Sequence, residues 1–298
     1  MTTVARGGYD AVAGLCATAL VRMPMLEAPF VAAGRRLWHW RRPARLYRSV
    51  VGRYADRLRS AGREFRTLAV GGRALALDVT EFTTLPMYFG GITYEPQTTE
   101  FVRAHLAPGD VFVDVGANHG YFTLLAAALV GERGGVFSFE PNPDTRARLA
   151  VHVARNGFES RVTVESAALC DTAGSGRLYL SRWPANSGIT SLTPSPENLA
   201  DGGLSPEHTI DVDTDTFDAW RAGRKVGRIA IVKMDAEGAE DLIVRGMCAS
   251  LRAGAVDAVV CETRGDSEAH RTLLSHGFAA TMLEQNGPLT NIGYVRPR

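Results

Sequence analysis

The pattern of apolar positions changes from a helical period to a period of two near residue 65. The first part of the chain follows the helical pattern, with breaks at Pro24 and Pro43. Residues 66–78 then alternate around the pair Gly71-Gly72, and this alternation predicts a β-hairpin. The change in pattern predicts a helical N-terminal region, residues 1–65, and a second domain, residues 66–298.

The second domain repeats one simple unit. From about residue 98, helical segments alternate with short, almost wholly apolar runs, which are typical of strands buried on both faces. The predicted strands are 111–115, 135–139, 161–165, 229–234 and 258–261, with helices at 99–106, 120–130, 144–156, 240–247 and 267–276. We expect Asp144 to cap its helix. Repeated β-α-β units predict a mostly parallel, doubly wound α/β sheet.

Two stretches depart from this alternation. The runs 278–283 and 291–295 have no helix between them, which predicts an antiparallel closing pair. Residues 171–209 are rich in Gly, Ser, Pro, Thr and Asn, and only 176–181 has the pattern of a strand. Loops of this length inside a domain are usually functional or disordered, so we expect a lid-like insertion there.

Composition excludes several classes of protein. The 298 residues carry a net charge of +1, which argues against nucleic-acid binding by the chain as a whole. The four cysteines lie far apart, so they predict neither a zinc site nor a disulfide scaffold, but reduced thiols in the cytoplasm. No apolar run reaches the ~18 residues that a transmembrane helix needs. The apolar run 11–21 is flanked by Asp10 and Arg22, and we interpret it as an amphipathic helix rather than a signal peptide.

Positive charge is concentrated in one part of the N-terminal region. Between Gly34 and Arg66 there are eleven arginines, one aspartate and one glutamate, interleaved with Trp38, Trp40, Tyr47 and Tyr54. One interpretation is a surface for an anionic partner, such as a phosphorylated substrate, a membrane face or nucleic acid. The other, which we favour, is a solvated helix face or a subunit contact, because arginine stems commonly cover apolar surface. The aromatic residues could bury a homodimer contact.

Candidate binding residues follow the first predicted strand, at the edge where doubly wound sheets bind ligands. The strand ends in Asp114-Val115-Gly116-Ala117-Asn118-His119-Gly120. Gly116 and Gly120 allow a tight turn, and the next helix offers free N–H groups. The loop lacks the G-x-G-x-x-G spacing of dinucleotide sites. A carboxylate at Asp114 would repel a pyrophosphate but attract an ammonium or sulfonium, so the local electrostatics favour S-adenosylmethionine over NAD.

Acidic residues also follow two other predicted strands. Glu140 ends the second strand, about 20 residues after the glycines, where a carboxylate can accept hydrogen bonds from a ribose diol. Lys233, Asp235, Glu237 and Glu240 lie around the end of the run 229–234. Asp235 or Glu237 could cap the following helix. Lys233 lies inside a buried strand and therefore requires a charged partner. Their position favours a functional cluster.

Three segments together resemble a known family. They are "VFVDVGANHGYFTLLAA", "FSFEPNP" and "IVKMDAEGAEDLIVRG". In combination they resemble the FkbM-type methyltransferases, which are class I enzymes with a Rossmann-like sheet, and the resemblance extends over roughly residues 75–285. Many members of that family O-methylate hydroxyls of sugars or of natural products. The arginine-rich region lies outside the resemblance.

The resemblance implies roles for individual residues. Asp114, Gly116, Asn118 and Gly120 would hold the methionine part of S-adenosylmethionine, Glu140 the ribose, with Asn142 adjacent, and Ala167 and Ala168 would lie against the adenine. Asp235 and Glu237, with Lys233 beside them, would face the acceptor. Asn186–Leu192, "NSGITSL", resembles a recurrent family segment and is expected in a lid over the acceptor.

The sequence therefore predicts a methyltransferase that acts on a hydroxyl of a small molecule, such as a sugar or a glycosylated natural product. A hydroxyl needs help to react, and Asp235 or Glu237 could supply it as a general base or as a ligand for a divalent metal, although no metal motif is present. Two alternatives stay open at this stage: an NAD(P)-dependent oxidoreductase, and a non-enzymatic module that binds anions through the N-terminal arm.

Overall fold

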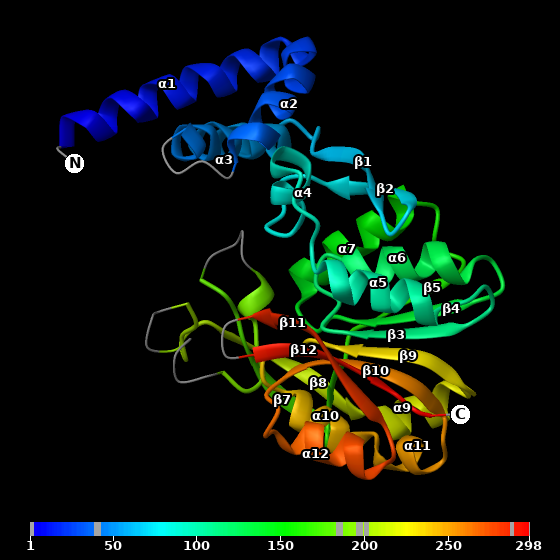
Figure 1. Cartoon of the computed structure of the whole chain (residues 1–298). Coiled ribbons are helices and arrows are strands. Elements are labelled where there is room, and N and C mark those ends of the chain that lie inside the picture. The colour runs from blue at the N-terminus through cyan, green and yellow to red at the C-terminus, as the bar shows by residue number, and fades with distance from the viewer. Residues whose placement is uncertain are drawn as a thin grey trace. The chain divides into compact units, whose positions relative to one another are not determined.

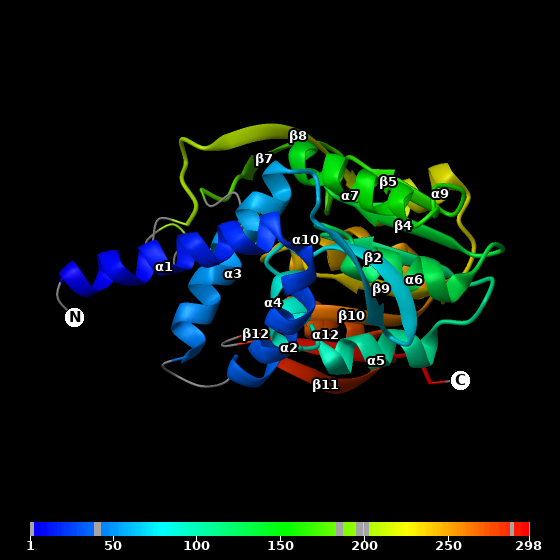
Figure 2. The same ribbon diagram turned by 90° about the horizontal axis from the view of Figure 1, so that it is seen from above.

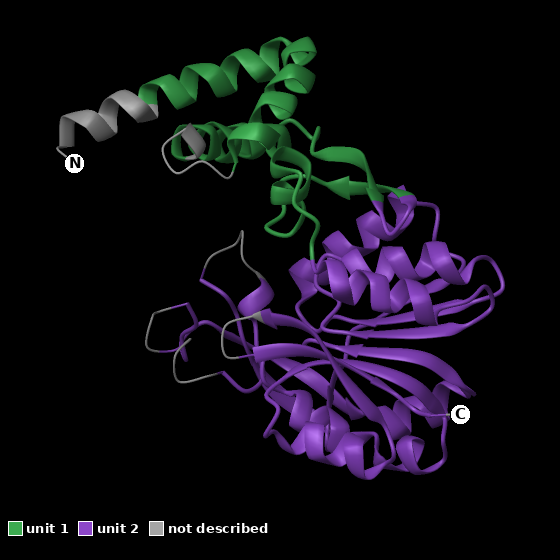
Figure 3. Ribbon diagram, viewed as in Figure 1, with its two compact units in different colours: residues 1–69, 74–94 green, residues 70–73, 95–298 purple. Residues whose placement is uncertain are grey.

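The computed structural model describes residues 3–38, 43–182, 187–194, 199, 203–286 and 289–297. Trp40 and Asn186, together with parts of the predicted lid, lie outside the described residues. The chain forms two compact units, which Figure 3 colours separately. Unit 1 comprises residues 1–69 and 74–94, and unit 2 comprises residues 70–73 and 95–298. The methyltransferase-domain boundary predicted near residue 65 stays a prediction.

Unit 1 is mainly helical. It contains α1 (Thr3–Arg22), the short 3-10 helix η1 (Pro24–Leu26), α2 (Glu27–Leu37), α3 (Pro43–Ser60), the strands β1 (Phe65–Val70) and β2 (Arg73–Asp78), and α4 (Thr84–Gly90). The breaks predicted at Pro24 and Pro43 are confirmed, because α1 ends at Arg22 and α3 begins at Pro43. The hairpin is confirmed too, with Gly71 and Gly72 both at positive φ in its turn. The sequence analysis missed α4.

One buried carboxylate holds several elements of unit 1 together. The Glu27 carboxylate at the start of α2 receives two hydrogen bonds of 2.6 Å from the guanidinium of Arg66, and the hydroxyls of Tyr54 and Tyr88 also donate to it. Burial alone would raise the pKa of Glu27, but these hydrogen bonds outweigh it and lower the pKa to about 2. This network joins α2, α3, β1 and α4.

Unit 2 is built on a seven-stranded sheet with the order β11-β12-β10-β9-β3-β4-β5. Its strands are β3 (Val111–Val115), β4 (Gly135–Phe139), β5 (Val162–Glu165), β9 (Ile229–Met234), β10 (Val256–Thr263), β11 (Ala279–Asn286) and β12 (Leu289–Val295). The strands β3, β4, β5, β9 and β10 are parallel, and β12 runs antiparallel to both β10 and β11. The predicted mostly parallel Rossmann-like sheet with an antiparallel closing pair is confirmed.

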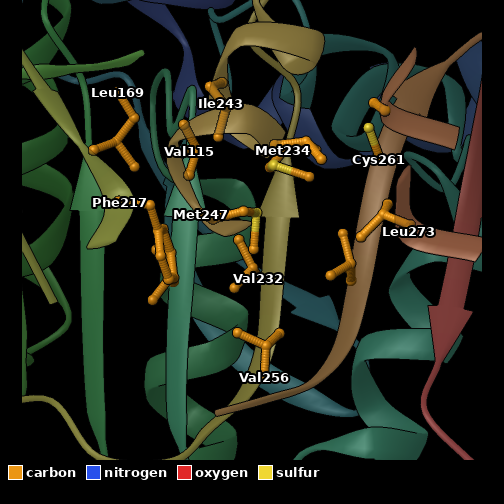
Figure 4. Packing of buried hydrophobic residues seen from close by; sticks show 14 of the residues in the cluster. Val115, Leu169, Phe217, Val232, Met234, Ile243, Met247, Val256, Cys261 and Leu273 are labelled. Carbon is orange, nitrogen blue, oxygen red and sulfur yellow. The ribbon is translucent and has the colours of Figure 1, made fainter. Parts of the chain in front are cut away.

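Helices cover both faces of this sheet (Figure 1). One face carries α5 (Pro96–His105), α6 (Tyr121–Val130) and α7 (Pro143–Arg155), and the other carries α9 (Phe217–Arg224), α10 (Glu240–Gly246), α11 (Cys248–Arg252) and α12 (Glu268–Ser275). Figure 4 shows the core on the second face, where Val115, Val232 and Met234 pack beside Ile243 and Met247. These side chains alternate with those that point to the first face, so the first face remains available for polar residues of β3 and β9.

Chain order reverses at the centre of the sheet. From β3 the chain builds outward through β4 and β5, and it then returns to place β9 on the other side of β3. In open α/β sheets, ligands bind beyond the carboxyl ends of the strands at this reversal. The loops after β3 and β9 therefore occupy the position expected of a binding site.

The stretch from 171 to 209 and its surroundings contain more regular structure than predicted. A small sheet of order β6-β8-β7 comprises β6 (Ala168–Cys170), β7 (Gly174–Tyr179) and β8 (Thr209–Thr216). Figure 2 shows β7 and β8 running side by side. The sequence analysis missed β6, β8 and α9, because β6 is short and β8 is polar along most of its length, unlike a strand buried on both faces.

No single helix among the described residues has both the length and the apolar composition needed to cross a membrane. Residues 11–22 and 24–37 meet these requirements only as a pair, and the two segments are bent by 113° relative to each other.

Candidate active site

Asp114, at the end of β3, is buried and only partly satisfied. It is 1% exposed. Its Oδ2 receives a hydrogen bond of 2.6 Å from the hydroxyl of Thr123 in α6, whereas its Oδ1 is buried without a hydrogen-bond partner within the described part of the chain. Burial raises the pKa of Asp114, although Lys233 and Thr123 oppose this effect. A buried carboxylate oxygen without a donor is costly unless a ligand supplies one.

The loop after Asp114 is held in one conformation by its glycines and by β4. Gly116 has φ 75°, and a Cβ there would collide with the carbonyl oxygen of Asp235 in the neighbouring loop. The N–H groups of Gly116 and Ala117 donate to the carbonyl of Phe139 over 3.1 and 3.0 Å. Gly120 has φ 90° and precedes the first residue of α6. Both glycines therefore occupy positions that other residues adopt only with strain.

Glu140 connects this loop with the next one. Its Oε2 accepts from the backbone N–H of Asn118 over 2.9 Å, and its Oε1 accepts from the N–H of Asn142 over 3.0 Å. Burial raises the pKa of Glu140 to about 7, against the opposing effect of these two N–H groups. Each oxygen keeps a lone pair, so the carboxylate can still accept two hydroxyl donors.

The helix cap predicted at Asp144 is wrong. The side chain of Asn142 caps α7, because its oxygen accepts from the N–H of Asp144 over 3.1 Å. Pro143 is the first helical residue, and proline is favoured there since its missing N–H would be unpaired in any case. Asn142 thus has a structural role besides its predicted place near the ribose.

Lys233 and Asp235 form an ion pair at the carboxyl end of β9. Lys233 is 4% exposed, and its Nζ lies 3.1 Å from Oδ2 of Asp235 and 4.9 Å from the ring centre of Phe122. Burial lowers the pKa of Lys233, but Asp235, Asp114 and Glu95 raise it more, so the net shift is upward. The charged partner expected for Lys233 is therefore confirmed. Lys233 also pairs in register with Asp114 on β3, which brings the two predicted groups onto one face.

Glu237 lies in the loop after β9, in a left-handed conformation with φ 53°. Burial, followed by the charges of Asp235, Glu262 and Glu240, raises the pKa of Glu237 to about 9. The predicted capping role for Asp235 or Glu237 is wrong. Instead the carboxylate of Glu240 accepts from the N–H groups of Ala236 and Gly238, over 2.6 and 3.0 Å, and closes the loop.

The described part of the predicted lid lies against this loop. Ser191 is buried and donates through its hydroxyl to the carbonyl of Glu237 over 2.6 Å. The backbone of Ser191 pairs with that of Tyr179 in β7, and Thr193 lies next to Gly238. The segment 187–194 is therefore anchored beside Glu237, as expected of a segment next to an acceptor site.

The structure adds polar residues that the sequence analysis missed. The amide of Asn291 donates to the carboxylate of Glu95 over 2.9 Å and to the hydroxyl of Thr98 over 3.3 Å. Asn291 is also the register partner of Glu262, at the carboxyl end of β10. No sequence signal marks this group, because it depends on the insertion of β12 between β10 and β11.

The two alanines predicted near the adenine differ in their surroundings. Ala168 lies in β6 and packs in a small apolar cluster with Leu178 and Val212, whereas Ala167 is half-buried. Their predicted contact with a cofactor stays a prediction.

Electrostatically, the site is dominated by carboxylates. The carboxylates that interact electrostatically here are Asp114, Asp235, Glu237, Glu262 and Glu95. Several of them interact with the same cation, Lys233. Such a site attracts a cationic ligand and repels a pyrophosphate. The described residues contain no group of three or more His, Cys, Asp and Glu side chains arranged to hold a metal ion.

Comparisons with known proteins show relatives of this chain and the family to which it belongs. The curated hexuronic acid methyltransferase AglP of Haloferax volcanii is 32% identical over 156 residues, which is 51% of this chain and 55% of that protein. The chain thus matches about half the length of that relative. Among solved structures, it is similar to the methyltransferase FkbM of Methylobacillus flagellatus KT, with 12% identity, coverage of 85% of this chain and 60% of that one, and a TM-score of 0.41.

A second solved structure is the fibrillarin of Aeropyrum pernix, in complex with S-adenosyl-L-methionine. It shows 13% identity, coverage of 64% of this chain and 68% of that one, and a TM-score of 0.39. The sequence profile of the methyltransferase FkbM domain matches residues 114–287. With more than half of its length matched in this way, the chain belongs to the FkbM methyltransferase family.

Proposed function

We propose that this protein is an S-adenosylmethionine-dependent methyltransferase that methylates a hydroxyl of a sugar or of a glycosylated natural product. The observation that carries the proposal is the unsatisfied Oδ1 of Asp114, buried at the reversal of the sheet beside a glycine loop. The family membership and the hexuronic acid relative support methyl transfer to a sugar.

The residues present fit this cofactor. Asp114 would accept a hydrogen bond from its ammonium group, Glu140 would accept from the two ribose hydroxyls, and the N–H groups at the start of α6 would receive its carboxylate. When bound, S-adenosylmethionine supplies an electrophilic methyl group on a sulfonium that is a good leaving group. NAD(P) fits poorly, because its pyrophosphate would meet Asp114.

The protein's own residues would orient the acceptor and move its proton. We assign the general base to Asp235, which Lys233 holds in place through their ion pair. Because the pKa of Glu237 is raised to about 9, it is protonated at neutral pH and would donate a hydrogen bond to an acceptor oxygen. The hydroxyl of Ser191 donates to the carbonyl of Glu237 and holds the backbone of this loop.

The test is calorimetric titration of the full chain with S-adenosylhomocysteine, on wild type, on Glu140→Ala, and on Glu132→Ala as an exposed control. We expect micromolar binding to wild type and to the control, and loss of at least about tenfold in affinity for Glu140→Ala. Absence of binding to folded wild-type protein, or preferential binding of NAD, would refute the proposal.

The state of the cysteines bears on the compartment of the protein. The four cysteines are free thiols, three of them at least partly accessible, and we therefore propose the cytoplasm.

A further inference from the structure

The helix α1 is apolar on two opposite sides. Ala13, Ala17 and Leu20 are buried, and α1 packs against α3, beside which it lies in Figures 1 and 2. On the other side, Val12 and Leu15 are exposed, Leu15 to 72%. Over residues 11–21, α1 has no charged residue, and its exposed apolar side chains there need a partner surface if they are to leave water.

Exposed apolar side chains also follow the end of α1 in the sequence. Met23, Met25 and Leu26 follow in and around η1, and Met25 is 80% exposed. We call the five side chains Val12, Leu15, Met23, Met25 and Leu26 the apolar patch. They make up five of the eleven exposed large hydrophobic residues in the described part of the chain, and all five lie within 15 residues of sequence. A cluster of this kind indicates an interaction surface, whereas scattered exposed apolar residues do not.

The exposed charge of the described parts of α1, α2 and α3 is mostly positive. Within the described residues 11–34, Arg22 is the exposed charge, since Glu27 is buried and bonded to Arg66. Further along, the exposed charges of α2 and α3 are Arg35, Arg36, Arg45, Arg48 and Arg53, against one exposed acidic residue, Asp56. The helices of unit 1 thus combine exposed apolar side chains with an excess of arginine. This combination suits a partner surface whose outer layer is anionic and whose inner layer is apolar.

We propose that the helices α1 to α3 dock unit 1 onto an anionic lipid bilayer. The apolar patch inserts at the level of the acyl chains, and the arginines bind lipid phosphates. The 113° bend between the two apolar segments, each too short to span the bilayer, fits helices that lie in the interface. A symmetric dimer through this face would place arginines of one copy near those of the other, so lipid is the better occupant.

The experiment is flotation of the full chain with vesicles of phosphatidylcholine alone or mixed with phosphatidylglycerol, at low and at high salt. The variant is Leu15→Ser with Met25→Ser. The control is Leu274→Ser with Met282→Ser, which removes an exposed leucine and methionine of unit 2. Because all four side chains are exposed, the variants should keep the wild-type melting temperature. Calorimetry with S-adenosylhomocysteine on the same proteins separates this proposal from the proposed function.

We expect wild type and control to float with the anionic vesicles at low salt, and much less with neutral vesicles or at high salt. The patch variant should partition at least about tenfold more weakly, because each lost side chain removes apolar burial. Replacing Arg22 and Arg36 by glutamine should weaken partition by about fivefold per arginine. Failure of folded wild type to float, or equal flotation of patch variant and control, would overturn the proposal. So would a wild-type dimer that the patch variant abolishes, in the absence of vesicle binding.

Discussion

The two units bury carboxylates in opposite ways. In unit 1, Glu27 is surrounded by donors, with Arg66, Tyr54 and Tyr88 all hydrogen-bonded to it, and its pKa is lowered to about 2. In unit 2, Asp114 is buried with one oxygen unpaired among the described residues, Glu237 is half-buried with other carboxylates nearby, and the pKa of each is raised. The difference teaches that burial alone does not distinguish a structural carboxylate from one proposed to be functional. The number of hydrogen-bond donors around the carboxylate distinguishes Glu27 from Asp114.

A fully paired carboxylate stabilises the fold, whereas an unsatisfied one costs stability and must be retained for another reason. Unit 1 therefore uses Glu27 to connect its helices. Under the proposed function, Asp114 and Glu237 lie at the edge of the sheet where ligands bind, and a cationic ligand would supply the hydrogen bond that Asp114 lacks.

The largest expected effect comes from breaking the Glu27 network. Glu27→Gln should lower the free energy of unfolding by about 2–4 kcal/mol, because it leaves the largely buried Arg66 without its counter-charge. Stability from this ionised carboxylate is present above its unfolded pKa of about 4.5 and is lost as the pH falls toward 2, so the variant should approach wild type in acid. Urea unfolding at pH 7 and at about pH 2.5 measures both effects.

Asp56→Asn, an exposed substitution in the same unit, is the matched control and should change the stability by less than about 0.5 kcal/mol. If Glu27→Gln proves as stable as this control, the contrast between the two units is mistaken. Affinity for S-adenosylhomocysteine should be the same in Glu27→Gln and in wild type.

Asp114→Asn should have the opposite effects to Glu27→Gln: it should not lower the stability, and it should weaken cofactor binding. It removes a buried, partly unsatisfied charge, so stability should be unchanged or higher. Affinity for S-adenosylhomocysteine should fall by about a hundredfold, because a charge-assisted hydrogen bond to the ligand's ammonium is lost. Calorimetric titration and a thermal melt of the same sample measure the two quantities.

Asp211→Asn, on the exposed side of β8, removes the same charge outside the site and should bind like wild type. Unchanged affinity in Asp114→Asn would show that the ammonium does not contact this carboxylate, and the proposed orientation of the cofactor would have to be abandoned.

The parts of the site that lie close in sequence could be predicted, and the parts assembled by topology could not. Asp114, Gly116 and Gly120 form one loop after an apolar strand, so their position followed from the pattern. Lys233 was expected to have a charged partner because it interrupts a buried strand, and Asp235 is that partner. These inferences needed only the periodicity of strands and the rule that ligands bind beyond their carboxyl ends.

The group around Glu95 and Asn291 depends instead on contacts between distant segments. The two residues are 196 positions apart, and they meet because β12 runs antiparallel beside β10. The fold prediction failed in the same way at β8, where pairing with β6 and β7 makes a strand from polar residues that carry no buried-strand pattern. At α7 the error was local, since Pro143 shifted the cap to Asn142.

Glu140 provides a smaller effect that depends on pH. Its pKa is raised to about 7, and the ribose hydroxyls require the ionised form as acceptor. Affinity for S-adenosylhomocysteine should therefore be about tenfold higher at pH 8 than at pH 6. Glu140→Gln should bind weakly at both values. Titrations in one buffer series measure this dependence.

Glu240 has a pKa raised by burial to about 7 as well, and it is the control for the assignment. Glu240→Gln should retain the pH dependence of binding, because the Glu240 carboxylate accepts from backbone N–H groups of its own loop. If the dependence disappears in Glu240→Gln and persists in Glu140→Gln, the titrating group has been misassigned.

Glu237 gives the sharpest test of the comparison, because the direction of its pKa shift is opposite to that of Glu27. Its pKa is about 4.5 when unfolded and about 9 when folded, so the folded state binds the proton more tightly. The resulting loss of stability is absent below pH 4.5, grows as the pH rises toward 9, and is constant above that. Glu237→Gln mimics the protonated form and should melt well above wild type, by about 5–15 °C, at pH 8.5.

At pH 4.5 the two proteins should melt together, since the carboxyl group is then protonated in the folded wild type. Asp235→Asn is the matched variant: it removes the charge that raises the pKa of Glu237, but it also leaves the buried Lys233 unpaired, so it should lower the melting temperature. A lower melting temperature for Glu237→Gln at pH 8.5 would mean that the ionised carboxylate stabilises the fold as Glu27 does. In that case a raised pKa could no longer serve to separate the functional carboxylates of unit 2 from the structural one of unit 1.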